Sequence, residues 1–288
     1  MDTINTVASP TQEASERYFR NLPVAEHSRP RAFAPSALLL DDPADFAPRA
    51  LAPSASADFM LPDTSIEPDS LADVSTESPL IIAFADGVSQ ANRSAVRLSM
   101  RFAETVARLE TDGQVGGTKW LEHFTSAMSY GGWQNLNGFT FSEYSTANAS
   151  LTMDTLVLEL VSAIAGPNAA TVVQLLSLTL DRLQSDSRLT TLFERNTQYA
   201  AERSFRIMPC LESSTGIPVT YLLAVDFSAS QDMGGALFWK WRVSRLNIRR
   251  MAVGVEFNLD LHNDLYRKRI LDYLGEDSDS FFASLPRR

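Results

Sequence analysis

The chain has 288 residues, of which 44% are apolar, and its formal net charge at pH 7 is −10. A globular chain of this size can bury one large core or two modest ones. Its negative charge argues against nucleic acid or an anionic membrane as the main partner. The single cysteine excludes an internal disulfide, and three histidines without a Cys/His cluster do not form the pattern of a structural zinc site.

The two ends of the chain show no targeting or lipidation pattern. Met1-Asp2-Thr3 opens neither a basic nor an apolar secretion segment, and Asp2 stands where N-myristoylation requires glycine. Nowhere does an apolar run reach the roughly 18 residues of a membrane-spanning helix. We therefore expect a cytoplasmic protein, or one that attaches peripherally to a membrane or is exported by a signal-independent route.

We expect three parts along the chain: an arm over residues 1–77, a core domain over 78–275 and a tail over 276–288. Ten of the fourteen prolines fall between Pro10 and Pro79, a density that disfavours long helices and central strands. Residues 11–21 can form a short helix. The rest of the arm is predicted to wrap the body as a strap or to be partly disordered.

The first half of the core is predicted to be helical. A helix over 80–109 would start at Ser78 as N-cap and Pro79 as first residue. The most apolar pair, an αα-hairpin broken by Gly166-Pro167, carries Leu176 and Leu180 in its second helix. Further stretches are predicted as follows: helices 119–130, 151–165, 168–183, 188–199 and 265–274, and a brief strand 139–141.

Residues 203–259 are predicted to form an antiparallel sheet. Alternation over 205–210 and 219–227, with a turn at 213–216, predicts a hairpin. In this register Met208, Cys210 and Leu222 share one face, while Phe205 and its bulky partners share the other. Arg206 and Asp226 become diagonal neighbours on the first of these faces. Cys210 is therefore expected to lie beneath a layer of helix.

Two further runs, 237–243 and 253–259, are predicted as the third and fourth strands. Between Lys240 and Arg250 the chain has five basic residues and no acidic one. They form either a solvated strand-and-turn surface or a docking place for a phosphate or an acidic carrier protein. The predicted fold class is α+β: a helical N-terminal and middle region packed on a C-terminal antiparallel sheet of about four strands, in a single domain.

Cys210, the only cysteine, allows two interpretations. A lone cysteine in an apolar strand is commonly a small buried hydrophobe. A reactive thiol requires a lowered pKa or a neighbouring base, and no histidine is close in sequence. The helices at 151–183 suit either a central core or the wall of a tunnel for an acyl chain, and the two are compatible.

The layout as a whole resembles the Evf (Erwinia virulence factor) family of bacterial proteins. The resemblance covers roughly residues 75–275 and rests on chain length, on a helical middle before a sheet, and on the cysteine in Phe205-Arg-Ile-Met-Pro-Cys210. It implies a virulence lipoprotein with a palmitoyl group in thioester linkage to Cys210. The acyl donor would be acyl-CoA or an acyl carrier protein, with no metal or other cofactor required.

Three functions follow as alternatives. In the first, Cys210 transfers the acyl group as an acyltransferase or thioesterase, with His123 or else His262 as base and Asp226 to orient it. Met208, Leu222, Leu176 and Leu180 would line the acyl chain. In the second, the acyl group is permanent, and the protein is a non-catalytic effector at membranes or on a host partner. In the third, the thiol is inert and the chain is a binding or structural module.

Overall fold

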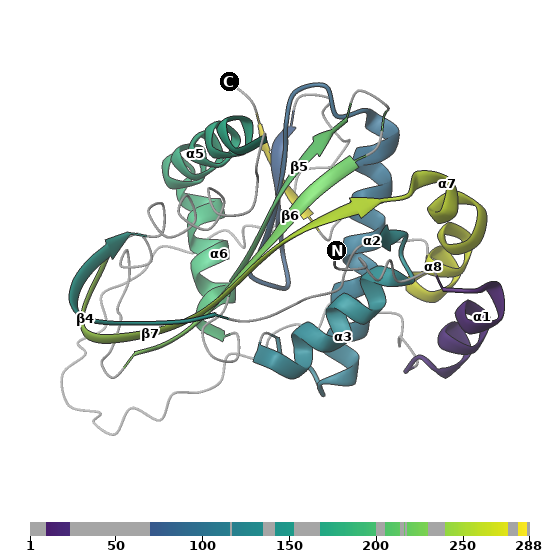
Figure 1. Ribbon diagram of the computed structural model, residues 1–288, viewed down its shortest axis with the longest axis horizontal. Helices are drawn as coiled ribbons and strands as arrows, with labels where there is room; N and C mark the ends of the chain where they lie inside the picture. Colours follow the sequence, from purple (N-terminus) through teal and green to yellow (C-terminus); the bar gives the residue numbers. More distant parts are fainter. Residues whose placement is uncertain are drawn as a thin grey trace, which may run out of the picture.

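The computed structural model describes residues 10–23, 70–115, 117–134, 142–152, 168–199, 205–213, 216, 218–229, 240–275 and 282–286. Over these residues the chain has the predicted α+β fold, in which one sheet separates two groups of helices (Figure 1). The strands are β1 (Ser70–Ser75), β2 (Leu80–Phe84), β3 (Trp133–Gln134), β4 (Ser142–Thr152), β5 (Phe205–Glu212), β6 (Pro218–Ala229), β7 (Lys240–Phe257) and β8 (Phe282–Pro286). The helices are α1 (Gln12–Asn21), α2 (Gln90–Glu110), α3 (Gly117–Ser129), α5 (Ala169–Ser185), α6 (Ser187–Tyr199), α7 (Leu259–Leu261), the π-helical turn η4 (His262–Tyr266) and α8 (Arg267–Leu274).

The sheet is larger than the four antiparallel strands that we predicted. Its described part has eight strands in the order β3-β7-β6-β5-β2-β1-β8, with β4 also paired to β7. It is mixed, because β2 runs parallel to β5 while the other pairs are antiparallel. Strands β1 and β8 extend the sheet beyond the core limits of residues 78 and 275 that we expected from the sequence.

The predicted helix over 80–109 is wrong in its first third. Residues Leu80–Phe84 form β2, every side chain of which is buried. A fully buried strand shows no alternation, so its sequence cannot be told from a buried helix by periodicity. Gly87 takes a φ of +86°, in the left-handed region that favours glycine, within the turn that follows. Helix α2 then starts after Ser89, whose side chain accepts from the backbone N–H of Asn92.

The predicted hairpin is confirmed in its turn and its register. Strand β5 pairs with β6 so that Phe205 lies opposite Val225 and Cys210 opposite Thr220. The turn is closed by the backbone N–H of Gly216, which donates to the carbonyl of Ser213 at 2.9 Å. Cys210 therefore belongs to the face that the sequence predicted for it.

The two last predicted strands are one continuous strand. Strand β7 runs over 18 residues and pairs with β4 on one side and β6 on the other. The five basic positions thus all belong to strand β7, without the turn that the predicted strand-and-turn surface included. The last predicted strand also ends earlier than residue 259. Leu259 begins the helical segment α7–η4–α8, which contains the predicted helix 265–274.

The other helix predictions divide into three groups. Helices α1, α3, α5 and α6 confirm the stretches 11–21, 119–130, 168–183 and 188–199 within two residues at each end. Residues 151–152, predicted as a helix start, end strand β4. The remainder of that helix and the strand at 139–141 lie outside the described residues.

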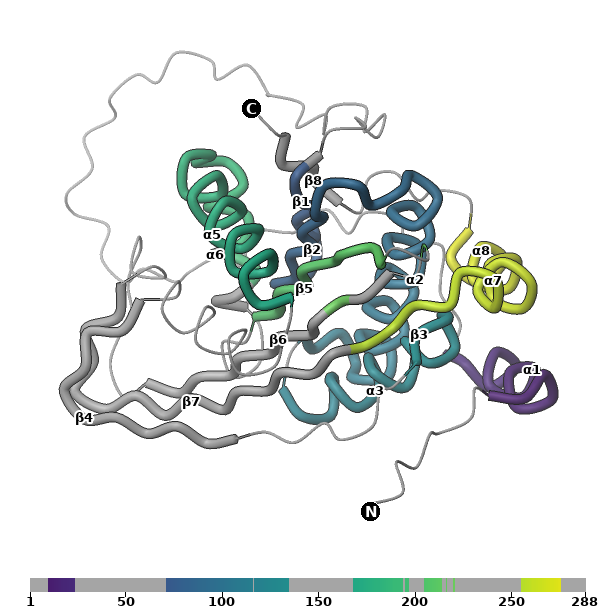
Figure 2. Tube along the Cα trace, turned by 45° about the horizontal axis from the view of Figure 1, so that its top comes forward, coloured from purple at the N-terminus to yellow at the C-terminus, as the bar shows by residue number. Residues whose placement is uncertain are grey.

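The sheet carries α2 and α3 on one face and α5 and α6 on the other. On β5 the Phe205 ring packs edge-on against Phe193 of α6, with centroids 6.3 Å apart. The adjacent Arg206 points the opposite way, and its guanidinium lies 5.2 Å from the Trp120 ring of α3. Figure 2 shows α5 beside α6, with α2 and α3 across the sheet. Helix α1 joins the α2 side, where Tyr18 stacks on Tyr130 at 3.7 Å.

Candidate functional site

Cys210 lies in the centre of the sheet and is fully buried. Its neighbours in the sheet are Phe84 of β2 and Thr220 of β6. The sulfur Sγ is 3.3 Å from the Thr220 hydroxyl oxygen and 3.7 Å from the carbonyl oxygen of Met208. Both contacts are weak hydrogen bonds of the kind that a neutral S–H group makes.

The thiol faces α2 and α3. Cys210 and Arg206 are four residues apart on one strand, so they share the face on which Arg206 meets Trp120. The same face carries Asp73 of β1. Asp73 pairs with Ile82 of β2, and Ile82 pairs with Met208 of β5, so the three residues lie side by side across the strands. The expectation that Cys210 lies beneath helix is therefore confirmed.

The layer between the thiol's face and α2 contains charged side chains. Arg97 forms a buried two-point ion pair with Asp73, with nitrogen to oxygen distances of 2.6 and 3.0 Å. The guanidinium groups of Arg93 and Arg97 lie 5.2 and 5.4 Å from the ring of Phe84, the β2 neighbour of Cys210. The layer is thus more polar than the greasy tunnel that the sequence suggested.

Burial raises the pKa of the Cys210 thiol to about 12. The hydrogen bond to Thr220 and the charge of Arg93 lower the pKa, whereas the carboxylate of Asp73 raises it, and desolvation outweighs them all. Because the thiolate is the nucleophilic form, the folded protein holds this sulfur in its unreactive state near neutral pH.

The structure separates Cys210 from two of the predicted lining residues. Leu176 and Leu180 are buried on α5, which lies with α6 across the sheet from the thiol (Figures 1 and 2). Met208 is buried on the thiol's own face, since it is two residues from Cys210. Leu222 holds a β6 register position two residues from Thr220, which belongs to that face as well.

Neither the predicted base nor its orienting carboxylate is observed to contact Cys210 among the described residues. Asp226 is six residues beyond Thr220 on β6, roughly 20 Å along the strand, where it is in register with Arg249 of β7. His123 is half-buried on α3, and among the described residues it makes no hydrogen bond or ion pair with Cys210. The carboxylate that does lie near the thiol, Asp73, is ion-paired with Arg97.

His262, the second candidate base, is a packed histidine at the β3–β7 edge of the sheet, against Phe257. Its ring is fully buried, and the Nδ1–H donates to the carbonyl of Gly131 at 2.6 Å. Burial lowers the pKa of His262 to about 4, so the ring is neutral at pH 7. Gly132, at a φ of +111°, allows the close approach, since an added Cβ there would lie 3.0 Å from the Cβ of His262.

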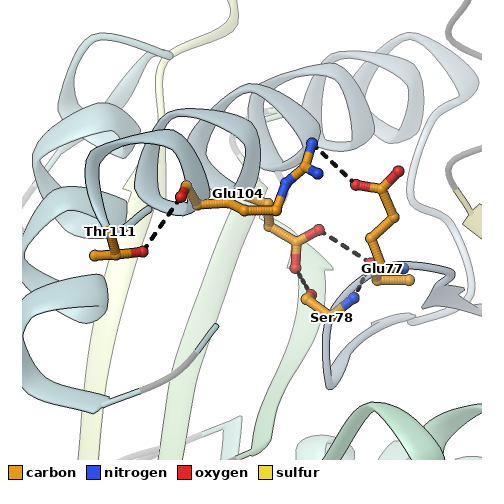
Figure 3. A network of polar contacts seen from close by, with 6 residues as sticks. Glu77, Ser78, Glu104 and Thr111 are labelled. Carbon is orange, nitrogen blue, oxygen red and sulfur yellow. Dashed lines mark hydrogen bonds and ion pairs between the residues drawn. The ribbon is translucent and has the colours of Figure 1, made fainter. Parts of the chain in front are cut away.

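A second buried polar cluster was not predicted from the sequence. Glu104 of α2 accepts hydrogen bonds from the hydroxyls of Ser75, at 3.0 Å, and Ser78 in the β1–β2 turn (Figure 3). Burial raises the pKa of Glu104 to about 8. The signal for it was the helical spacing of Arg93, Arg97 and Glu104, which puts ionisable groups on the sheet-facing side of an apolar helix.

The described residues contain no group of three or more His, Cys, Asp or Glu side chains able to hold a metal ion. None of the helices in this part of the chain is long and apolar enough to cross a membrane.

Comparison with known proteins gives little on function. No protein-family model matches the chain, and no curated protein matches it. A solved structure described as "Structure of the Evf virulence factor" is similar at 10% sequence identity and a TM-score of 0.30, over 72% of this chain and 84% of that chain. A likeness of this size carries no argument about function, so the family resemblance stays a prediction from the sequence layout.

Proposed function

We propose that the protein is a non-catalytic carrier that holds one long acyl chain, such as palmitate, as a thioester on Cys210. The observation that supports it is the complete burial of the thiol, with its raised pKa. A site that disfavours the thiolate is poorly suited to repeated nucleophilic attack. The same site suits a thioester, which is uncharged and which burial shields from water.

Loading of the sulfur precedes completion of the fold. In the unfolded or nascent chain the thiol is accessible and has its ordinary pKa of 9.0. Its thiolate attacks the carbonyl carbon of acyl-CoA or of an acylated carrier protein. A new carbon–sulfur bond forms, the donor's thioester bond breaks, and the donor leaves as a thiol that takes up the proton released by Cys210. Folding then encloses the acyl group.

The acyl chain occupies the α2–α3 side of the sheet. Arg93 and Arg97 cover the Phe84 neighbour of the thiol, so the acyl chain leaves the sulfur on the side of Met208, next to the paired Asp73 and Arg97. Burying a sixteen-carbon chain contributes roughly 10 kcal/mol at about 0.8 kcal/mol per CH₂ group, before ordering costs. The α5 leucines Leu176 and Leu180 stabilise the opposite face and are not part of this proposal.

Acyl transfer, the catalytic alternative, has less support. It needs a base and an oxyanion site beside the sulfur; Asp226 lies six residues along β6 from Thr220, and His123 makes no hydrogen bond with Cys210 among the described residues. In the carrier proposal the acylated core stabilises the fold, and the folded surface binds a target. The family resemblance suggests a membrane or a host protein as that target.

Intact-mass measurement of the chain after expression in a bacterial host tests the proposal. We expect one added acyl mass that neutral hydroxylamine removes and that the Cys210→Ala variant never acquires. A second arm adds palmitoyl-CoA to deacylated protein, folded or in urea, and we expect loading in urea alone. An unmodified mass in every preparation selects the inert thiol instead. Repeated turnover with acyl-CoA and added amines or alcohols selects the enzyme.

A further inference from the structure

A buried carboxyl group of α2 binds two hydroxyls at the β1–β2 connection. Glu104 projects from α2, with 3% of its surface exposed. Its Oε2 accepts from the hydroxyl of Ser75 at 3.0 Å, and its Oε1 contacts the hydroxyl of Ser78. Ser75 Oγ in turn accepts from the backbone N–H groups of Glu77 and Ser78, at 3.3 and 3.2 Å, so the turn is folded around it.

The same turn carries the contacts that position α6 and β5. The side-chain amide of Asn196 on α6 donates to the carbonyls of Ser75 and Ser78, at 3.0 and 3.1 Å. The carbonyl of Pro79 accepts from the backbone N–H of Arg206 at 2.7 Å. The carboxyl group on α2 therefore lies at a junction where two helices and three strands meet.

The charge state of Glu104 is decided by few neighbours. Glu77 of the turn is negative, and it is paired with Arg108 of α2 at 3.2 Å. Arg108 and Arg206 of β5 favour the ionised form of Glu104, Glu77 disfavours it, and the group that α6 contributes, Asn196, is uncharged. No ion pair to Glu104 occurs among the described residues, so burial decides, and it favours the neutral acid.

The neutral acid also fits the hydrogen bonds. Its carbonyl oxygen can accept from Ser75, and once Oε1 carries the proton, the contact that Ser78 now donates can reverse, with Glu104 donating to the Ser78 hydroxyl. Ionisation would leave both hydroxyls as donors to a negative charge that lacks a paired cation in the described structure. The unfavourable ionised state bears on the β1–β2 connection, because the end of β1 and the turn supply the two hydroxyls, Ser75 and Ser78.

We propose that Glu104 is a proton-controlled latch: its neutral form fastens the β1–β2 turn, to which Asn196 attaches α6, to α2, and its ionisation releases the turn and α6. The released turn exposes the Ser75 and Ser78 carbonyls that Asn196 binds in the closed form. The latch is closed in acid and loosens through neutral to alkaline pH, since the pKa of Glu104 is raised from 4.5 to about 8. This inference does not depend on acylation of Cys210.

Hydrogen exchange of the full chain between pH 5 and 9, read by mass spectrometry, tests the latch. After correction for intrinsic exchange, the opening equilibrium of the turn and α6 should increase about tenfold per pH unit up to about pH 8. Peptides from α3 and α8 should stay constant. In Glu104→Gln, which is neutral at every pH, the dependence should vanish and the turn should stay protected.

Two further variants keep the test decisive. Glu77→Gln removes a nearby exposed charge that raises the pKa of Glu104. The pH dependence of exchange should therefore persist, but the pH at which it levels off should be lower. Ser75→Ala removes the hydrogen bond that favours the ionised form of Glu104, so the pH at which the dependence levels off should be higher. This variant still tests the latch if Glu104→Gln fails to fold. A pH dependence that survives in Glu104→Gln, or that affects all segments equally, overturns the latch.

Discussion

The reactivity of Cys210 toward a thiol reagent separates a buried carrier site from a working nucleophile. The perturbation is unfolding in urea, which exposes the sulfur and returns its pKa to the ordinary value of 9.0 from about 12. This difference alone reduces the thiolate fraction of the folded protein about 1000-fold near neutral pH. Enclosure adds to the effect, because the reagent must wait for the protein to open.

We therefore expect deacylated, folded protein to react with a chromogenic disulfide at least about 1000-fold more slowly than the same protein in urea. A matched control is Cys210→Ala combined with Ser187→Cys, which moves the sole thiol to an exposed position at the start of α6. That thiol should react at similar rates in both conditions. If native Cys210 reacts within about tenfold of its rate in urea, the sulfur is accessible and our reasoning on the carrier fails.

Three other expectations concern the packing around the site. Arg97→Met and Asp73→Asn should each lower the free energy of unfolding in urea by about 3–5 kcal/mol, and the double variant by less than their sum, because each single change removes one partner of the same buried ion pair; two costs below about 1 kcal/mol would contradict this. Gly131→Ala places a Cβ 2.2 Å from the Ser99 hydroxyl and should cost about 1–3 kcal/mol, partly recovered by adding Ser99→Ala, whereas an unchanged melting temperature would disprove the close contact. The pKa of His262 is lowered from 6.5 to about 4, so the free energy of unfolding should decrease by about 3 kcal/mol as pH falls between these values. His262→Gln should abolish this decrease, and a decrease that persists in the variant would belong to other groups.

The facing of Cys210 could be predicted because it depends on local sequence. Alternation in two adjacent runs and the length of the turn between them fix the register, and register fixes the face of each residue. Which helices cover that face depends on contacts far apart in the chain. The apolar helix with Leu176 and Leu180 suits either face of a sheet, so its place across from the thiol was not available from pattern alone.

Two errors in the predicted helix and strand boundaries have the same physical cause. Leu80–Phe84 is buried on both sides, and strand β7 pairs along 18 residues in spite of its basic stretch. A strand inside a sheet is selected by its neighbours, β1 and β5 for the first and β4 and β6 for the second. Such tertiary partners override the local periodicity and turn signals on which a sequence prediction rests.

The opposite shifts of Glu104 and His262 together define a pH range for the fold. Glu104 loses stabilisation as pH rises from 4.5 to about 8, and His262 loses it as pH falls from 6.5 to about 4. Each contributes a slope of about 1.4 kcal/mol per pH unit inside its own interval. Between pH 4.5 and 6.5 the two slopes have opposite signs and cancel. The combined contribution of these two groups is therefore level across weak acid and falls on both sides, for separate reasons: Glu104 on α2 above this range, and the packed ring beside Gly131 below it.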